Sequence, residues 1–248
     1  LVKMSVKSIC VIPARYGSSR FPGKVLADLL GKPVIQHVYE KAAGSKADAV
    51  LIAADDERVI AAVNGFGGKA GMTSPSHNSG TDRIYEAVAD EDYDIIINVQ
   101  GDEPLLPSKV IDELIDLMKS HPEYEMATVA VPAKREEVSD PNRVKVVFNA
   151  SGRALYFSRS VIPYLREGGE EAGVYRHWGI YAYRKDVLSR FVQLPGSSLE
   201  NCEKLEQLRA LENGISIHVM VVDELESLGV DTPEDLKLVE KTLREKCR

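Results

Sequence analysis

Residues 9–24 read ICVIPARYGSSRFPGK, and this stretch decides how the rest of the chain is interpreted. An apolar run, residues 9–12, stops at Pro13 and leads into a loop that carries Arg15, Arg20 and Lys24 among small residues. No acidic residue occurs in residues 9–27, although the whole chain has a formal net charge of -7. A buried strand that runs into such a loop is typical of a phosphate site, because glycines let backbone N–H groups approach closely while cations neutralise charge. A solvated basic turn explains the composition equally well.

The basic loop matches neither of two common phosphate-binding motifs. The spacing from Gly17 to Gly23 is one residue longer than in a Walker A loop, and Val25 stands where that motif needs a metal-binding Ser or Thr. The dinucleotide fingerprint GxGxxG does not follow the first apolar run either. The pattern therefore disfavours a nicotinamide oxidoreductase.

Composition limits the other classes of function. The pI of about 5.4 argues against a broad nucleic-acid surface, which needs a basic face. Three cysteines, Cys10, Cys202 and Cys247, form no CxxC pair, and their odd number is poorly suited to a disulfide framework. The start, LVKMSVKS, is too short and too polar for a signal peptide, and no apolar run has the length of a membrane span. We therefore expect a cytoplasmic protein without membrane insertion.

Strand and helix patterns alternate along most of the chain. Continuous apolar runs predict strands buried on both faces, whereas apolar residues at helical spacing predict helices between them. This alternation predicts an α/β fold with a mostly parallel central sheet, Rossmann-like in kind. The strands are expected at 49–54, 94–99, 126–131 and 215–222, and the helices at 34–42, 59–63, 110–118, 199–211 and after Pro233.

The pattern changes in the third quarter of the chain. Residues 144–149, the turn Ala150-Ser151-Gly152, residues 154–158 and residues 175–183 have the spacing of shorter strands and hairpins. We interpret residues 132–195 as a smaller antiparallel lobe inserted in a single domain of residues 1–248. Such a lobe is suited to covering an acceptor or to forming a dimer contact.

Two aspartates are candidates for metal binding. Asp102 follows the predicted strand 94–99 within the sequence QGDEP, and carboxylates at the carboxyl end of a central parallel strand often serve ligand chemistry. Asp231 precedes Thr232, which can cap the last helix, with Asp235 at the position of a capping-box acid. The alternatives are a turn acid for Asp102 and a charge stabilised by the helix dipole for Asp231. Sequence favours the metal role for Asp102 and leaves Asp231 undecided.

Seven blocks, in order from residue 12 to residue 236, carry a resemblance to a known family. They are IPARYGSSRFPGK, HNSGTDR, NVQGDEP, ALYFSR, RHWGIY, LEQLR and GVDTPEDL. The chain resembles the 3-deoxy-manno-octulosonate (KDO) cytidylyltransferases, also called CMP-KDO synthetases. The resemblance implies a nucleotidyltransferase fold, transfer of a cytidylyl group from CTP to KDO with release of pyrophosphate, dependence on Mg²⁺, a homodimer and a role in lipopolysaccharide biosynthesis.

The resemblance also implies roles for individual residues. Lys24, Asp102 and Asp231 would be catalytic, with the two aspartates holding Mg²⁺. The nucleotide would be bound by Pro13, Ala14, Arg15, Ser18, Arg20, Lys24, Ser79, Gly80 and Gln100. KDO would be bound by Arg159, His177, Tyr181, Glu206 and Gln207. Judged by residue type alone, a His or Tyr on a strand is more often structural, and Glu206 and Gln207 lie on a charged helix face that is by default solvated.

The expected reaction is an in-line attack of the anomeric hydroxyl of KDO on the α-phosphorus of CTP, catalysed mainly by positioning and charge neutralisation. A related enzyme acting on amino-KDO or a sialic acid is the nearest alternative. The acidic, glycine-rich loop at residues 166–175 matches no family block and leaves the choice of acceptor open. A catalytically silent nucleotide-binding module is an alternative of another class, although both aspartates and all three loop cations are present.

Overall fold

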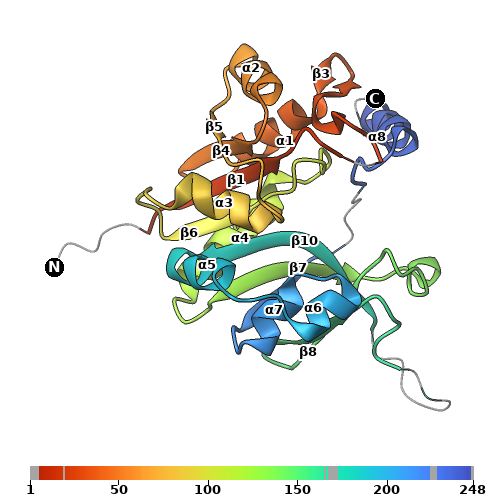
Figure 1. The fold of residues 1–248 in the computed structure, drawn as a ribbon. Coiled ribbons are helices and arrows are strands. Elements are labelled where there is room, and N and C mark those ends of the chain that lie inside the picture. The colour runs from red at the N-terminus through yellow and green to blue at the C-terminus, as the bar shows by residue number, and fades with distance from the viewer. Residues whose placement is uncertain (1–5, 19, 165, 167–172, 224–227, 247–248) are drawn as a thin grey trace. The chain divides into compact units, whose positions relative to one another are not determined.

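The chain forms two compact units in a computed structural model, which describes residues 6–18, 20–164, 166, 173–223 and 228–246. Residues 1–119 with 226–248 form unit 1, and residues 120–225 form unit 2 (Figure 1). The lobe expected at residues 132–195 falls within unit 2. The start of the chain, Cys247 and most of the loop 166–175 lie outside the described residues.

Unit 1 is built on a parallel sheet with the strand order β6-β1-β4-β5. Cys10 pairs with Val50 on one side and with Ile97 on the other, and all three side chains are buried, as expected for strands covered on both faces. Burial raises the pKa of Cys10 to about 12, so this cysteine is a neutral core residue. The strands are β1 (Ser8–Ala14), β4 (Ala49–Ala54), β5 (Ala70–Met72) and β6 (Ile95–Asn98).

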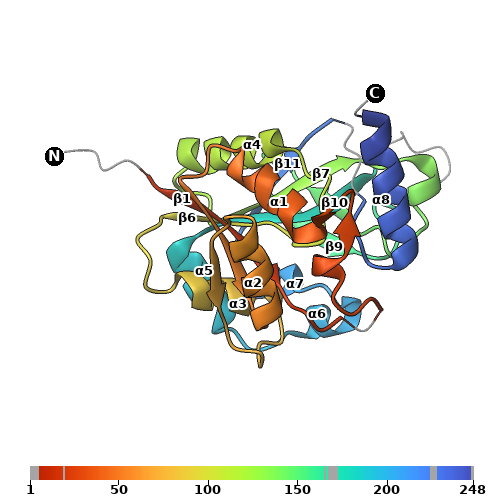
Figure 2. The same ribbon diagram turned by 90° about the horizontal axis from the view of Figure 1, so that it is seen from above.

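Helices cover both faces of these strands, with α3 on one face and α1 and α4 on the other (Figure 2). Each helix buries the apolar positions that its spacing predicts, such as Val34, Ile35, Val38 and Ala42 in α1. No helix among the described residues is long and apolar enough to cross a membrane. The helices are α1 (Val34–Ala43), α2 (Glu57–Gly65), α3 (Gly80–Val88) and α4 (Ser108–Ser120).

The last helix, α8 (Pro233–Lys246), belongs to unit 1 although it is far along the chain. Val230 and Val239 pack in one apolar cluster with Leu29, Val34 and Leu105. This cluster joins α8 to the segment that follows the basic loop, which consists of a short helix η1 (Lys24–Leu26) and the two-residue strands β2 (Asp28–Leu29) and β3 (Lys32–Pro33). The packing therefore places α8 beside the segment that follows β1 and the basic loop.

Unit 2 contains the central strand β7 (Met126–Pro132), which pairs with β11 (Ile217–Val221) in parallel and with β10 (Tyr175–Arg184) in antiparallel fashion. The predicted hairpin is present as β8 (Lys145–Phe148) and β9 (Ala154–Ser158), and Gly152 in its turn has a φ of 81°. Residues 175–184 form one long strand with a bulge instead of several shorter ones. The remaining elements are η2 (Arg135–Glu137) and α5 (Lys185–Val192).

The single helix expected at residues 199–211 is wrong, because the structure contains two short helices there. They are α6 (Ser198–Glu203) and α7 (Gln207–Glu212). Lys204 adopts a left-handed conformation with φ 54° and ends α6, and the next residue, Leu205, is buried. A left-handed residue that is not glycine leaves no signal in the sequence.

Candidate functional site

A cavity of about 370 Å³ opens in unit 1 where β1 and β6 end. Its volume lies within the range of small-molecule sites, and ligands of α/β proteins bind beyond the carboxyl ends of the strands. All nine predicted nucleotide and metal residues outside β1, together with Pro13, line this cavity. The lining residues are Pro13, Arg15, Ser18, Arg20, Lys24, Val25, His77, Asn78, Ser79, Gly80, Arg83, Gln100, Gly101, Asp102 and Asp231.

The basic loop folds back on itself at one wall of this cavity. The Gly23 amide donates to the Tyr16 carbonyl over 2.9 Å, and Gly23 adopts a φ of 71°, which favours glycine. The turn brings Arg15, Arg20 and Lys24 to the same cavity. The loop is thus a cationic wall rather than an isolated solvated turn, as the anion-site interpretation requires.

Lys24 lies between the two aspartates that were candidates for metal binding. Its Nζ is 2.6 Å from Asp102 Oδ2 and 2.9 Å from Asp231 Oδ1. Arg20 contributes a second cation, 3.0 Å from Asp231 Oδ2. The structure therefore brings together two carboxylates that are far apart in the sequence, and they share one cation.

Backbone contacts hold the two aspartates in place. The Val230 amide donates to the Asp102 carbonyl over 2.8 Å, and this bond holds the residue before Asp231 against Asp102. Asp235 Oδ2 accepts from the amides of Asp231 and Thr232, and Thr232 Oγ1 accepts from the Asp235 amide. The predicted cap is therefore confirmed, and it also fixes the loop that presents Asp231.

The ionisation of this cluster is set by opposing effects. Burial acts to lower the pKa of Lys24, but the two carboxylates outweigh burial, and its pKa is raised. Burial likewise acts to raise the pKa of Asp231, but Lys24 and Arg20 outweigh it, and its pKa is lowered. Both groups are charged near neutral pH.

The two carboxylates fit a magnesium ion. Mg²⁺ takes one or two carboxylates and completes its coordination with water and phosphate oxygens. Asp102 and Asp231 already converge on one cation, and their side chains are 29% and 46% exposed, so both are accessible from the cavity. Within the described parts of the chain no group of three or more His, Cys, Asp or Glu side chains is arranged to hold a metal ion.

A second wall of the cavity is packed closely against Pro13. A Cβ on Gly101 would lie 2.8 Å from the Pro13 carbonyl oxygen, and a Cβ on Gly80 would lie 3.3 Å from Pro13 Cγ. The Ser79 hydroxyl caps α3 by accepting from the Asp82 amide over 3.1 Å, and Gln100 Nε2 donates to Asn98 Oδ1 over 3.0 Å. Ala14, which was expected near the base, is buried at the end of β1 and is not among the lining residues.

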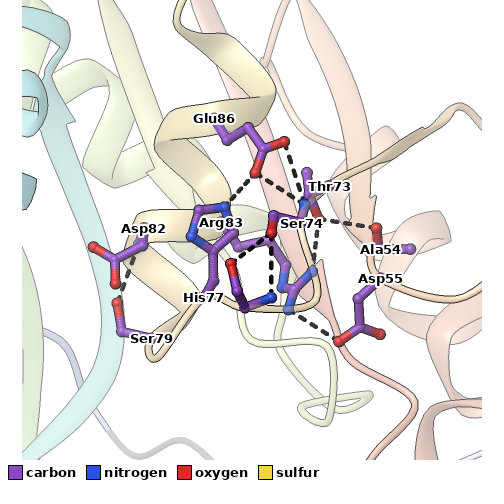
Figure 3. Close-up of polar contacts among 10 residues, drawn as sticks. Ala54, Asp55, Thr73, Ser74, His77, Ser79, Asp82, Arg83 and Glu86 are labelled. Carbon is purple, nitrogen blue, oxygen red and sulfur yellow. Dashed lines mark hydrogen bonds and ion pairs between the residues drawn. The ribbon is translucent and has the colours of Figure 1, made fainter.

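The sequence reasoning missed Asp55, Arg83 and His77 (Figure 3). Arg83 is 3% exposed, lines the cavity and forms an ion pair with Asp55 over 3.0 Å. The pKa of Glu86 is lowered, first by a hydrogen bond from the Ser74 amide and then by the contact of its carboxylate with His77 Nε2. Asp55 follows the buried strand β4 directly, which is the same signal that identified Asp102, so it could have been found.

The predicted acceptor residues lie in unit 2, where His177 and Tyr181 are neighbours on β10. The register of β10 against β7 shifts between Trp178 and Tyr181, so that His177 pairs with Ala130 and Tyr181 pairs with Thr128. His177 and Tyr181 are four residues apart, so ordinary alternation puts them on the same face, and their ring centroids are 5.4 Å apart across the bulge. Burial lowers the pKa of His177 to about 3, and its Nε2 lies 2.9 Å from Thr128 Oγ1, so the ring is neutral and hydrogen-bonded.

Of the other three acceptor candidates, Arg159 and Glu206 have partners within unit 2, and Gln207 is buried. The Arg159 guanidinium donates to the carbonyls of Pro141, Glu203 and Lys204, bonds that use three of its N–H groups. Glu206 Oε1 accepts from Arg209 Nη2 over 2.9 Å. Gln207 is 6% exposed, so the solvated helix face is not the environment of this residue.

Comparison with known proteins identifies the family of the chain. Residues 9–217 match the sequence model of the family described as cytidylyltransferase. A 3-deoxy-manno-octulosonate cytidylyltransferase of Thermodesulfovibrio yellowstonii is 54% identical over 254 residues, which cover 95% of this chain and 98% of that protein. An 8-amino-3,8-dideoxy-manno-octulosonate cytidylyltransferase of Shewanella halifaxensis is 50% identical, with 94% of this chain and 97% of that protein covered.

A solved structure gives the same answer for the fold. The structure of a CMP:2-keto-3-deoxy-manno-octonic acid synthetase complexed with CTP is 47% identical, has a TM-score of 0.93, and is matched over 97% of this chain and 99% of that one. The predicted α/β nucleotidyltransferase fold with a mostly parallel sheet is thus confirmed. The chain belongs to the cytidylyltransferase family, in the group formed by the 3-deoxy-manno-octulosonate enzymes and their 8-amino-3,8-dideoxy counterparts.

Proposed function

We propose that this protein transfers the cytidylyl group of CTP to 3-deoxy-manno-octulosonate and releases pyrophosphate. The observation that carries the proposal is the cavity in which Arg15, Arg20 and Lys24 face Asp102 and Asp231. A triphosphate needs cations along its length, and a magnesium ion needs carboxylates beside it. Relatives of about half-identical sequence that carry this activity by name support the choice of nucleotide and acceptor.

In this mechanism the chain supplies position and charge. Arg15, Ser18 and Arg20 bind the phosphates, while Lys24 stabilises the negative charge that builds at the α-phosphate. Asp102 and Asp231 hold Mg²⁺, which when bound neutralises phosphate charge and polarises the α-phosphate. The anomeric hydroxyl of the sugar gives up its proton to water as its oxygen forms the new O–P bond, and the bond from the α-phosphorus to pyrophosphate breaks.

The nucleotide base is assigned to the second wall of the cavity, which is packed against Pro13. We propose that Pro13, Ser79, Gly80 and Gln100 bind cytosine, chiefly through backbone groups, whereas Ala14 is buried outside the cavity lining. The close contacts of Gly80 and Gly101 with Pro13 support this role, because glycines at these positions keep backbone groups accessible. Amide and carbonyl groups can distinguish the amino group of cytosine from the carbonyl oxygen of uracil.

The acceptor is assigned to unit 2. We propose that Arg159 binds the sugar carboxylate with N–H groups that its three carbonyl bonds leave over, and that His177, Tyr181, Glu206 and Gln207 bind the hydroxyls. The neutral His177 supports this assignment, because a neutral imidazole can donate and accept hydrogen bonds.

We also propose a location for the reaction and an oligomeric state for the protein. CTP is available in the cytoplasm, so we place the reaction there. We propose a homodimer, and the exposed Leu155 and Tyr164 of unit 2, 61% and 86% exposed, support an apolar contact of that kind. Light scattering on the purified protein tests it, and a mass of one chain at micromolar concentration would contradict the dimer.

A second acceptor is favoured by a specific observation. A relative named for 8-amino-3,8-dideoxy-manno-octulosonate is 50% identical to this chain, close to the 54% and 51% of two relatives named for the unmodified sugar. A pyrophosphate-release assay with CTP, Mg²⁺ and a panel of acidic sugars separates the two. Faster turnover with 3-deoxy-manno-octulosonate supports the proposal, faster turnover with the 8-amino sugar favours the alternative, and release with a sialic acid alone would overturn both.

A further inference from the structure

A buried ion pair beside the cavity has no part in the chemistry described above. Arg83 Nη2 donates to Asp55 Oδ2 over 3.0 Å, and Arg83 Nη1 donates to Thr73 Oγ1 over 2.6 Å (Figure 3). The side chains of Arg83 and Asp55 are 4% and 14% exposed. Removing two charges from water is costly, and an apolar pair of similar volume often stabilises a fold at least as well. Stability alone is therefore a weak reason for this pair.

The second oxygen of Asp55 reaches the basic loop. Asp55 Oδ1 accepts from the Tyr16 amide over 3.0 Å, directly after Arg15. One carboxylate thus joins three parts of unit 1: the loop that follows β1, the end of β4, and helix α3, which carries Arg83. Thr73 extends the chain of bonds, because its hydroxyl and its amide both donate to the Ala54 carbonyl, over 2.9 and 2.7 Å.

Two of these parts line the nucleotide cavity. The basic loop contributes the cations proposed to bind phosphate, and residues 77–80, where α3 begins, contribute the wall assigned to the base. The walls meet where Gly80 packs on Pro13. A fixed distance between the walls is what a ligand with a base at one end and a triphosphate at the other requires.

We propose that Asp55 is a positioning residue for nucleotide binding. Its carboxylate holds the Tyr16 amide and the Arg83 guanidinium at a fixed separation, so that the cationic loop and residues 77–80 bind one CTP molecule together. Thr73 supports this role by fixing the other end of the guanidinium. The inference rests on the proposed use of CTP and adds a residue that does not touch the reacting atoms.

The test compares two aspartates at opposite ends of the same strand. Asp48 precedes β4, and its Oδ2 accepts from the Ser8 amide over 2.8 Å, whereas Asp55 follows β4 and accepts from the Tyr16 amide. Asp48→Asn is therefore a matched control that removes the same charge at the end of the sheet away from the cavity. The dissociation constant of CTP is measured by titration calorimetry, and the KM values of CTP and acceptor by pyrophosphate release.

Asp55→Asn is expected to weaken CTP binding by about tenfold or more and to raise the KM of CTP accordingly, because a misplaced wall loses contacts throughout the site. The KM of the acceptor is expected to stay within about twofold of wild type in Asp55→Asn, because Asp55 belongs to unit 1 whereas the proposed acceptor residues belong to unit 2. The dissociation constant and KM of CTP are expected to stay within about twofold in Asp48→Asn, because Asp48 lies away from the cavity. A folded Asp55→Asn variant that binds CTP within about twofold of wild type would overturn the proposal.

A second pair of variants keeps the test decisive if Asp55→Asn does not fold. Thr73→Val removes the hydroxyl that Arg83 contacts, whereas Thr73→Ser keeps it. CTP binding is expected to weaken about three- to tenfold in the Val variant and to stay near wild type in the Ser variant, since one hydrogen bond to a charged group is lost in the first only. Equal CTP affinity in the two would overturn the positioning role.

The outcomes separate this inference from the proposed function. Wild-type protein that binds CTP but transfers it to no acceptor would contradict the proposed function, while the CTP affinities of the variants would still decide the role of Asp55. Wild-type protein that binds no CTP would overturn both. Normal transfer by wild type and by Asp55→Asn would overturn the inference alone.

Discussion

Asp102→Asn is the substitution that bears most directly on the cation site. The carboxylate of Asp102 lies 2.6 Å from Lys24 Nζ and shares this ammonium with Asp231 at 2.9 Å. The amide of asparagine has nearly the same shape but carries no charge, so the substitution removes one of two carboxylates proposed to hold Mg²⁺. Lys24 keeps its ion pair with Asp231 and is not left without a partner.

The expected loss is large in turnover and small in stability. Charge stabilisation by a bound metal is worth several kcal/mol, so losing about 3–5 kcal/mol of it lowers kcat by about 10²–10⁴. The Lys24–Asp102 pair is partly screened by solvent, since the side chains are 14% and 29% exposed. Its loss is therefore expected to cost about 1 kcal/mol of folding free energy, or a fall of about 2–4 °C in Tm.

Pyrophosphate release and thermal unfolding measure the two effects side by side. Asp116→Asn is the matched control, because Asp116 forms an ion pair of the same 2.6 Å length with Lys46 but is 55% exposed and lies outside the cavity lining. The control is expected to keep kcat and Tm close to wild type. An Asp102→Asn protein with kcat within about tenfold of wild type would refute the metal assignment.

Three further predictions rest on other parts of the structure. Gly101→Ala places a Cβ 2.8 Å from the Pro13 carbonyl oxygen and is expected to destabilise the fold by about 1–3 kcal/mol and to raise the KM of CTP, as measured by denaturation and by kinetic assays. Gly65→Ala, which has open space around its Cβ, is the control and should change neither quantity. The raised pKa of Lys24 and the lowered pKa of Asp231 keep both groups charged at neutral pH, so the stability from Lys24 should be lost only above pH 10.5 and that from Asp231 only below pH 3.8. Urea unfolding of wild type and Lys24→Met should therefore show a constant difference in unfolding free energy across pH 5–9, and a difference that varies within that window would contradict the assignment. The pKa of His177 is lowered from 6.5 to about 3 in the folded protein, so as pH drops below 6.5 the unfolded chain binds a proton that the folded protein does not, and stability should fall. His177→Gln should lose less unfolding free energy between pH 7 and pH 5 than wild type, and equal losses would contradict a buried neutral ring.

The parts of the site that lie at strand ends could be predicted from the sequence. The basic loop after β1 and Asp102 after β6 both follow buried strands, and parallel strands end at one edge of a sheet. Asp55 carries the same signal after β4 but was not used. Asp231 was undecided without the family resemblance, because its approach to Asp102 depends on a backbone bond from Val230 and on apolar packing of α8, neither of which leaves a local pattern.

Unit 2 shows a different limit of sequence reasoning. The bulge in β10 that brings His177 beside Tyr181 contains Gly179, and an isolated glycine in a strand suggests a bulge without fixing how far the register shifts. The break between α6 and α7 depends on a left-handed lysine, Lys204, in a segment whose apolar spacing suits one helix. The sequence therefore suggests the bulge but not its register shift, and it gives no sign of the break at Lys204.

Product analysis of one complete reaction tests the central claim most directly. Wild-type protein is incubated with CTP, Mg²⁺ and 3-deoxy-manno-octulosonate, and the mixture is followed by phosphorus NMR and mass spectrometry. We predict one equivalent of pyrophosphate together with a phosphodiester that joins CMP to the sugar. Unchanged CTP, or CMP and phosphates without a sugar phosphodiester, would contradict the proposed cytidylyl transfer.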